Sequence, residues 1–516
     1  MLRYYQTEAH DRSIEANKSH RAVLVVMPTG TGKTPVMATL AQTEVSNGGR
    51  ALVLSNRKKL VRQAGKTIED FIGEQYGLEA GRSRAVGEMW PIVVASVQSM
   101  ANERLLAYPK DYFTKIIIDE AHHSLAPQYK DIFEHFSGAK CVGFTATPDR
   151  GDRRQLSEFY GCVAYEYPVK QALSDGFICN IQSVTLPIRV DISKVGRSQG
   201  DLNEGELAHA IEPYLDEIAR VTADFAKDRK ILTFLPIIET SKLACEVFNA
   251  HGIVTKHLDG TSKDIDAVID ELVRGDISNI VNSMLLTEGV DIPPVDCIIV
   301  LRPTESRPLY CQMVGRGTRV FPGKRNLLLL DFLWLTDKHD ICHPATIVSP
   351  NADITGLVTD AQNGQPFTPI DIFAEEEIAE HKFIRDREKK LARYLDENKH
   401  RKPKTVDPLQ YGIWTGDLDL VSYEPSFDWQ KAPATEQQKV ILESRGIDCE
   451  SITRGYAAAT IKSLNRNQNK ATPKQLKFLV AQGVKKVHAL TKQQASEILD
   501  RRFRRIDFIK RMKGRR

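Results

Sequence analysis

The chain has 516 residues, of which 41% are hydrophobic and 27% are charged. Those proportions are typical of a soluble globular protein, and the length predicts two or three domains. No apolar run is long enough to span a bilayer and the N-terminus lacks the apolar core of a signal peptide, so we expect no membrane contact. The 8 cysteines include no CxxC pair, which argues against a zinc site or a disulfide framework.

The first 165 residues alternate short apolar segments with helical patterns. The amphipathic stretch Lys58–Phe71 predicts a helix. Alternation of this kind is typical of a doubly wound α/β fold with a parallel sheet. Five β-branched runs predict its buried strands: Ala22–Val26, Ala51–Leu54, Ile92–Ala95, Lys115–Ile118 and Cys141–Phe144.

The strand pattern weakens after Tyr165 and resumes in a second α/β region. We interpret the polar span around 194–230 as the connection between two α/β domains. The predicted boundaries are residues 1–175 for the first domain, 176–340 for the second and 341–516 for an extension. Strands of the second domain are predicted at Lys230–Leu235, Asn279–Ser283, Cys297–Leu301 and Leu327–Asp331, with helices at Glu239–His251, Lys263–Arg274 and Arg307–Gly315.

The extension is predicted to be mostly helical. A charged helical stretch, Ala374–Asn398, precedes a weak internal repeat with a period of about 37 residues. The sequence of each copy predicts two helices. The first ends at a glycine, and the second begins at a threonine N-cap. The last sixteen residues are strongly basic, with Asp507 as their single acid. The repeat is carried by Ala434-Thr435, Gln438, Leu442 and Gly446-Ile447, which recur as Ala471-Thr472, Gln475, Leu479 and Gly483-Val484.

A phosphate-binding loop is predicted after the first strand. The segment Met27-Pro28-Thr29-Gly30-Thr31-Gly32-Lys33-Thr34 leads from a strand into a helical stretch. Glycines let backbone N–H groups approach phosphates at a helix N-terminus, so Thr29 to Thr34 are expected to bind ATP. Lys33 would reach the β- and γ-phosphates and Thr34 would bind Mg²⁺. Met27 stands where such loops usually have their first glycine, a departure that the strand–loop–helix context outweighs.

Two acids follow a second buried strand, Ile116-Ile117-Ile118. An Asp at the carboxyl end of such a strand is placed to hold Mg²⁺, so we assign this role to Asp119. The adjacent Glu120 is expected to orient or deprotonate the attacking water. Together with the phosphate-binding loop, the two acids predict phosphoryl-transfer chemistry.

Three motifs resemble those of superfamily 2 helicases: PTGTGKT, DEAHH and, downstream, QMVGRGTR. The resemblance covers roughly residues 2–335 and is specific because the motifs occur in combination. It implies two tandem RecA-like doubly wound parallel-sheet domains with ATP between them. It also implies catalytic roles for Gln312, Arg316 and Arg319, the two arginines reaching the γ-phosphate only when the cleft closes.

The same resemblance assigns further binding residues. Gln6 matches the glutamine that hydrogen-bonds adenine, and Gly289 and Asp291 match nucleotide-binding positions. Nucleic-acid contacts are implied for five residues on three motifs: Asn56, Arg57, Ser96, Gln98 and Thr287.

The branch within the superfamily is indicated by DEAHH together with Thr145-Ala146-Thr147-Pro148 and Arg150-Gly151-Asp152. These residues resemble the DNA-directed group of XPB-type translocases, phage UvsW-type helicases and restriction-enzyme motor subunits. The resemblance implies an ATP-dependent helicase or translocase acting on single-stranded, forked or branched DNA, in replication or repair. The alternatives are a double-strand translocase or restriction-type motor without unwinding, an RNA helicase, and a non-hydrolysing DNA-binding scaffold, which the intact ATP motifs disfavour.

For the extension we expect sequence-independent contacts with the DNA backbone, made by the repeat and the basic tail. The alternative is a docking module for replication or recombination proteins. The composition and the resemblance to phage-encoded helicases predict a cytoplasmic location in a bacterial or phage-infected cell.

Overall fold

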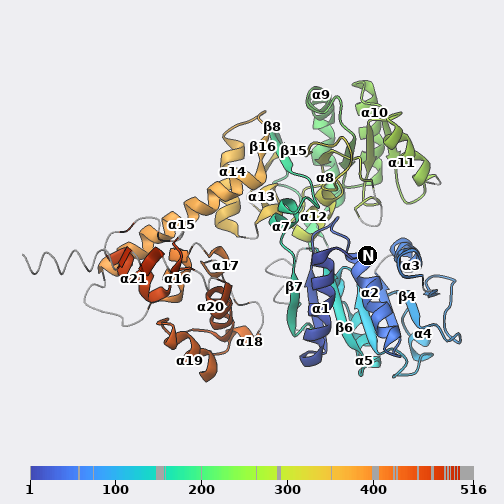
Figure 1. Cartoon of the computed structure of the whole chain (residues 1–516). Helices are drawn as coiled ribbons and strands as arrows, with labels where there is room; N and C mark the ends of the chain where they lie inside the picture. Colours follow the sequence, from blue (N-terminus) through green and yellow to red (C-terminus); the bar gives the residue numbers. More distant parts are fainter. Residues whose placement is uncertain are drawn as a thin grey trace, which may run out of the picture. The chain divides into compact units, whose positions relative to one another are not determined.

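The computed structural model describes residues 2–499 except for gaps, and it forms two compact units, Met1–Glu377 and Ile378–Arg516. Each unit is described by itself (Figure 1). Among the described residues, no helix is long and apolar enough to cross a membrane. The gaps are 56–57, 74, 147–155, 157–158, 199, 263, 288–291, 337, 350, 398–405, 416, 422, 424, 426–427, 450–451, 467–469, 482–483, 485–486, 488–489, 493 and 497.

The first α/β domain is built on a parallel sheet of seven strands in the order β3-β4-β2-β5-β6-β1-β7. All five strands predicted for it are confirmed. The strands are β1 (Ala22–Val26), β2 (Ala51–Ser55), β3 (Gly77–Glu79), β4 (Ile92–Ser96), β5 (Lys115–Ile118), β6 (Lys140–Thr145) and β7 (Cys162–Glu166). The helices are α1 (Tyr4–Ser19), α2 (Lys33–Ser46), α3 (Lys58–Ile72), α4 (Glu103–Leu106), α5 (Pro127–His135) and α7 (Val169–Ser174), with a short turn η1 (Ala121–His123).

Both faces of this sheet are covered, which explains why its strands are continuously apolar. Val23 and Val25 of β1 point into a core that also contains residues of α1, α2 and α3. The alternate residues Leu24 and Val26 point into a second core, which α5 closes on the opposite face.

The second α/β domain has seven strands in the order β12-β13-β11-β14-β15-β8-β16, and only β16 is antiparallel to its neighbour. All four strands predicted for it are confirmed. The strands are β8 (Ile181–Asp191), β11 (Ile231–Phe234), β12 (Thr255–Leu258), β13 (Asn279–Asn282), β14 (Cys297–Val300), β15 (Leu327–Leu335) and β16 (Ile370–Asp371). The helices are α8 (Glu204–Ile211), α9 (Leu215–Phe225), α10 (Ile238–Ala250), α11 (Ile265–Arg274) and α12 (Arg307–Gly315).

One interpretation of the sequence was wrong: the span around 194–230 does not connect the domains. It holds the small hairpin of β9 (Arg197–Ser198) and β10 (Asp201–Leu202), and then α8 and α9. Apolar side chains of these helices belong to the core of the second domain. The connection instead lies between α7 and β8, at residues 175–180.

The second sheet also draws on residues beyond 340, where the sequence placed the end of its domain. After α13 (Ala345–Val348) and α14 (Ala352–Asn363), β16 pairs with β8 at the sheet edge. Strand β16 leads into α15 (Ile372–Glu397), and the first compact unit ends at Glu377 within this helix.

The second unit is helical, as predicted, and has an apolar core of its own. Its first repeat copy begins at Thr435, whose side chain accepts from the backbone N–H of Gln438 while the Gln438 side chain accepts from that of Thr435. Thr472 and Gln475 of the second copy form the same pair of bonds. The helices are α16 (Pro408–Thr415), α17 (Leu418–Val421), α18 (Asp428–Lys431), α19 (Glu436–Ser444), α20 (Arg454–Arg466) and α21 (Pro473–Ala481).

Candidate nucleotide site

The loop between β1 and α2 has the backbone of a phosphate cradle. Gly30 and Gly32 have φ angles of 88° and 80°, and Gly32 directly precedes the first turn of α2. This left-handed conformation favours glycine and turns backbone N–H groups toward the helix axis. Met27 still belongs to the sheet: its N–H donates to the carbonyl of Thr145 at 2.9 Å and its side chain is buried. The loop therefore begins at Pro28, so the missing first glycine leaves the cradle intact.

Gln6 contacts this loop directly. Its amide nitrogen donates to the carbonyls of Thr31 and Gly32 at 3.1 and 3.0 Å, and its amide oxygen accepts from the N–H of Arg3. The hydroxyl of Tyr5 donates to the Thr31 carbonyl at 2.7 Å. Gln6 is thus hydrogen-bonded to the phosphate-binding loop, and its adenine contact stays a prediction.

Asp119 and Glu120 follow β5 at the same edge of the sheet, because parallel strands end on one side. Asp119 extends the ladder through its N–H to the carbonyl of Leu54, and its carboxylate accepts from the N–H of Glu120 at 3.0 Å. Glu120 has a φ of 50°, an uncommon conformation for a residue with a side chain. Its Oε1 lies 3.9 Å from Nζ of Lys33, and its Oε2 lies 3.5 Å from Nδ1 of His122.

The charge of Glu120 follows from these neighbours. Burial alone would raise the pKa of this carboxyl, but the positive charges of Lys33, the adjacent histidines and Arg316 outweigh burial. The pKa of Glu120 therefore lies below its ordinary value, and the group is ionised at neutral pH. An ionised carboxylate can accept a proton, as a general base must.

The C-terminal turn of α12 lies against the phosphate-binding loop. A Cβ on Gly315 would lie 2.7 Å from Cβ of Thr29, so only glycine permits this approach. A Cβ on Gly30 would lie 3.3 Å from Cγ of Arg319. Burial lowers the pKa of Arg319 to about 10, which leaves its guanidinium charged at neutral pH.

Arg316 and Gln312 are also buried at this turn. Arg316 donates through Nε to the carbonyl of Thr287 at 3.1 Å. Among the described residues, the Gln312 amide nitrogen and the Thr29 hydroxyl are buried without a hydrogen-bond partner. Buried polar atoms normally have partners, so these two fit a polar ligand between the loop and α12.

The predicted nucleic-acid residues are placed differently from one another. Ser96, at the end of β4, is fully buried and donates to the hydroxyl of Ser99 at 2.8 Å, whereas Gln98 is exposed. Thr287 is buried and donates to the carbonyl of Met284 at 2.7 Å. Four predicted residues lie outside the described part of the chain: Asn56, Arg57, Gly289 and Asp291.

Thr34 and Asp119, the predicted Mg²⁺ ligands, lie at the start of α2 and the end of β5. Within the described residues, no group of three or more His, Cys, Asp or Glu side chains forms a metal site. A magnesium ion held by one hydroxyl, one carboxylate and nucleotide phosphates does not need such a group. The two side chains therefore fit the role that the motif implies.

Two site residues escaped the sequence reasoning, Tyr5 and His122. Tyr5 stacks on Tyr167 with ring centroids 4.2 Å apart, in addition to its bond with the loop. His122 lies within the DEAHH motif, which could have drawn attention to it. Tyr5 adjoins Gln6, but its partner Tyr167, directly after β7, is 162 residues away in sequence, and no local pattern marks that contact.

A phosphate-binding loop and an acid pair on one parallel sheet, together with the buried Arg316 and the half-buried Arg319 from a second domain, define a two-domain P-loop protein of the RecA-like type. Two family models match the chain: the res subunit of type III restriction enzymes over residues 1–150, and the helicase conserved C-terminal domain over residues 213–321. Both matched parts of the chain are thus similar to superfamily 2 helicases and restriction motors.

Individual proteins show the same similarity. "Putative ATP-dependent helicase IRC3" of Saccharomyces cerevisiae is 28% identical over 69% of this chain and 54% of its own length. The endonuclease subunit of the type I restriction enzyme EcoAI of Escherichia coli is 27% identical over 65% of this chain and 46% of its own length. The chain thus spans about half the length of these relatives. A fragment of a putative HsdR subunit from Vibrio vulnificus has a TM-score of 0.53 and 25% identity, over 68% of this chain and 67% of that one.

Proposed function

We propose that the protein is an ATP-driven motor that moves along DNA or remodels it. One observation carries the proposal: the turn with Arg316 and Arg319 lies against the phosphate-binding loop, opposite the Lys33–Glu120 pair. Similarity to superfamily 2 helicases and restriction motors supports it. A bound triphosphate would touch both domains, so its hydrolysis can change how the domains are held.

In this proposal different residues of the chain bind the phosphates, activate water and stabilise the transition state. Lys33 leaves Glu120 and binds the β- and γ-phosphates, while the backbone N–H groups of the loop hold the rest of the phosphate chain. Glu120, ionised as described above, then orients water and takes its proton. Arg316 and Arg319 place positive charge where negative charge develops on the transferred phosphoryl group.

Magnesium would be held by Thr34 and Asp119 together with the nucleotide. Bound there, it would neutralise phosphate charge.

Coupling to nucleic acid is proposed to run through Arg316 and Thr287. The Nε of Arg316 donates to the backbone carbonyl of Thr287, which lies on a predicted nucleic-acid motif. An arginine that turns toward phosphate must adjust or break that bond. The nucleotide can thereby act on the strand-binding segment through one hydrogen bond.

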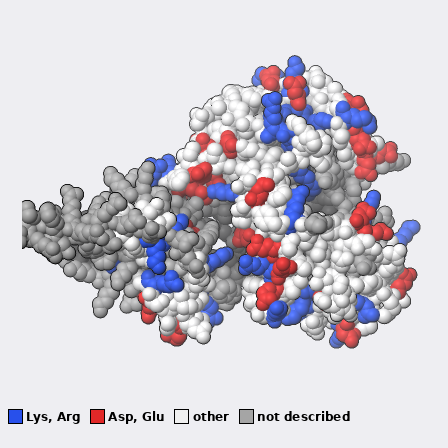
Figure 2. Space-filling model, in the orientation of Figure 1, with Lys and Arg blue, Asp and Glu red and all other residues white. Residues whose placement is uncertain are grey.

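The extension is proposed to tether the motor to DNA. On the face shown in Figure 2, acidic and basic side chains of Met1–Glu377 are interspersed, without a broad patch of one sign among the described residues. The two repeat copies differ sharply in sequence charge. Over residues 434–464 the first has Lys439, Arg445, Arg454 and Lys462 against Glu436, Glu443, Asp448 and Glu450, and over residues 471–499 the second has Lys474, Lys477, Lys485, Lys486 and Lys492 against Glu497.

Because the copies share one hydrogen-bonded scaffold, this difference reflects surface chemistry rather than fold. Five basic residues against one acid suit a polyanion, so we assign DNA contact to the second copy and the tail. Docking of a replication or recombination protein is the competing role, and it would not depend on these lysines.

The function is tested by ATP hydrolysis with and without DNA at low salt, using wild-type protein and Glu120→Gln. We expect DNA to raise the turnover of the wild type and the variant to be inactive. Unwinding of forked, overhanging and four-way DNA, and displacement of a triplex strand from duplex, then separate a helicase from a double-strand translocase. Matched RNA substrates test the RNA alternative. ATP turnover indifferent to every nucleic acid would overturn the motor proposal.

A further inference from the structure

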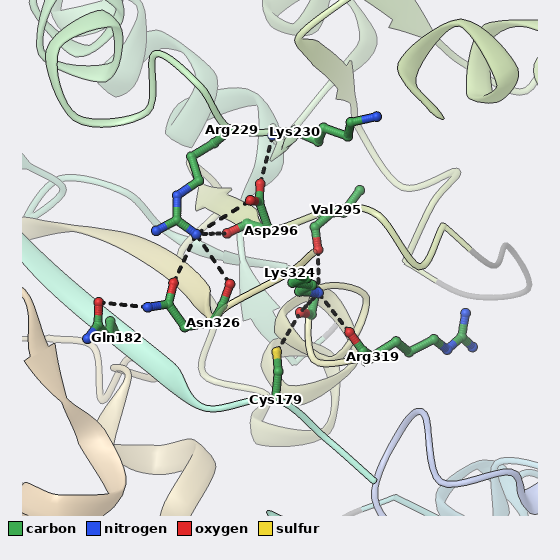
Figure 3. A network of polar contacts seen from close by, with 10 residues as sticks. Cys179, Gln182, Arg229, Lys230, Val295, Asp296, Arg319, Lys324 and Asn326 are labelled. Carbon is green, nitrogen blue, oxygen red and sulfur yellow. Dashed lines mark hydrogen bonds and ion pairs between the residues drawn. The ribbon is translucent and has the colours of Figure 1, made fainter. Parts of the chain in front are cut away.

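Lys324 lies in the loop between α12 and β15, and its ammonium group faces three backbone carbonyls. It donates to the carbonyl of Val295 at 2.6 Å, to that of Arg319 at 2.9 Å and to that of Gly317. An ammonium group has three donors and no acceptor, so all three of its hydrogens have partners here. Figure 3 shows this nitrogen between the carbonyls of Val295 and Arg319, with the Arg319 guanidinium extending away from it.

The segment Gly317–Arg319 is held from a second side by the connection between the domains. The N–H of Cys179 donates to the carbonyl of Thr318 at 2.8 Å, and its thiol to that of Gly317 at 3.5 Å. Ile178 also forms an isolated β-bridge with Arg319. The carbonyls of all three residues in the turn are therefore bonded.

The acceptor at Val295 is itself anchored. The carboxylate of the next residue, Asp296, accepts from the backbone N–H of Lys230 at 2.7 Å. Arg229 donates to the Asp296 carbonyl at 3.3 Å and to the Asn326 side chain at 2.9 Å (Figure 3). Lys324 thus ties the turn with Arg319 to the segment that leads into β14 of the second sheet.

We propose that Lys324 is a positioning residue for Arg319, holding the backbone from which this arginine reaches the nucleotide. Burial lowers the pKa of Lys324, so keeping a charged side chain here carries a cost that an apolar residue would avoid. Three converging carbonyl oxygens offset that cost, because hydrogen bonds from a charged donor are strong. Lysine meets this geometry with a single nitrogen, whereas the planar fork of arginine would not.

The inference rests on the proposed role of Arg319 in hydrolysis. Without Lys324, three carbonyls lose a donor and the turn can relax, while the phosphate-binding loop on the other domain is unchanged. Misplacing a catalytic group by about 1 Å can cost roughly 10²-fold in rate. We therefore expect a loss in kcat with little change in the KM for ATP.

The experiment compares Lys324→Met with Lys230→Met in full-length protein. Lys230 is the matched control because its ammonium also donates to a backbone carbonyl of the second domain, that of Val273, away from the arginine turn. We expect Lys324→Met to lower the DNA-stimulated kcat about 10- to 100-fold, with the KM for ATP within about twofold and Lys230→Met near wild type. If Lys324→Met does not fold, Lys324→Gln, which keeps two donors, replaces it.

A double-mutant cycle with Arg319→Ala then isolates the positioning role. If Lys324 acts through Arg319, adding Lys324→Met to Arg319→Ala should slow turnover no further. Additive losses, an unchanged kcat in Lys324→Met, or an equal loss in Lys230→Met would overturn the inference while leaving the motor proposal in place. Normal turnover of Arg319→Ala alone would remove the arginine assignment and this inference together.

Discussion

The ammonium nitrogen of Lys33 lies 3.9 Å from Oε1 of Glu120, joining the start of α2 to the end of β5. Both side chains are largely buried, with exposed fractions of 11% and 13%. The pair keeps each charge compensated before a nucleotide arrives, since a buried charge without a partner is costly. In the proposed mechanism, a triphosphate entering the loop would supply Lys33 with new negative partners and release Glu120 toward water.

Glu120→Gln should therefore bind ATP and fail to hydrolyse it. The amide keeps the shape of the side chain but cannot accept the proton of water, so we expect kcat to fall by about 10²- to 10⁴-fold. Equilibrium binding of a fluorescent ATP analogue and release of phosphate measure the two properties. Lys33→Ala is the comparison, because it should lose nucleotide binding itself. Near-wild-type turnover of Glu120→Gln would show that the general base is another group.

Gly32→Ala should damage nucleotide binding through two separate effects. Its φ of 80° disfavours any side chain, and a Cβ would lie 2.5 Å from the amide nitrogen of Gln6. Gly48→Ala is the matched control, since Gly48 has a φ of 82° with nothing within 4 Å of its Cβ position. We expect each to cost about 1 kcal/mol of stability from the backbone, and only Gly32→Ala to weaken ATP binding, by tenfold or more in titration. Equal ATP affinities would mean that the Gln6–loop contact does not shape the site.

Arg316→Ala and Arg319→Ala should both leave ATP affinity nearly intact and lower turnover by roughly 10³-fold or more. The two should differ in their response to DNA, because Arg316 alone is bonded to the carbonyl of Thr287. We expect Arg316→Ala to lose much of the ratio between stimulated and basal rates, and Arg319→Ala to lower both rates together. Steady-state ATPase assays over a DNA titration measure this ratio. Unchanged turnover per folded molecule would make the arginines structural.

Asp331 on β15 should make the folded state less stable at alkaline pH. Burial raises its pKa to about 7, whereas the unfolded chain has an ordinary aspartate. Folding thus favours the protonated form of Asp331. Its contribution to the free energy of unfolding is complete below about pH 4 and is lost as pH rises through about 7. Asp331→Asn should be more stable than wild type at pH 8, by on the order of 1–3 kcal/mol, and similar to it at pH 4. Thermal melts across this range test the sign, and a difference independent of pH would contradict the titration.

The extension should contribute salt-sensitive DNA affinity through its second repeat copy. Lys474→Gln, Lys477→Gln and Lys492→Gln together should weaken binding to forked DNA and reduce the slope of log affinity against log salt by up to about 3. The matched control is the triple change Lys439→Gln, Arg445→Gln and Lys462→Gln in the first copy. Deleting residues beyond 397 should weaken binding further and leave basal ATPase intact. Equal affinities and slopes for all four proteins would favour a protein-docking role.

Much of this protein is determined by its sequence alone, for a physical reason that particular segments show. Parallel strands covered on both faces are continuous apolar runs, so strands such as β1 and β5 stand out without any knowledge of their neighbours. Phosphate binding requires glycines, a lysine and a hydroxyl side chain close together in one short segment. Met27–Thr34 therefore indicates a nucleotide site before the fold is known. The helix Arg307–Gly315 was predicted with its observed bounds.

Other features were decided only by the tertiary structure. Strand β8 contains Gln182, Pro187 and Arg189, so its sequence lacks the continuous apolar run that marks a buried strand. It is a strand because it pairs with β15, which the sequence does not indicate. Ser96 is buried because the strand end and Ser99 enclose it, which its motif does not reveal. The place of Lys324 depends on carbonyls from two separate stretches of backbone, at Val295 and at Gly317–Arg319. Contacts between residues distant in sequence leave no local periodicity, and folding alone brings such groups within hydrogen-bonding distance.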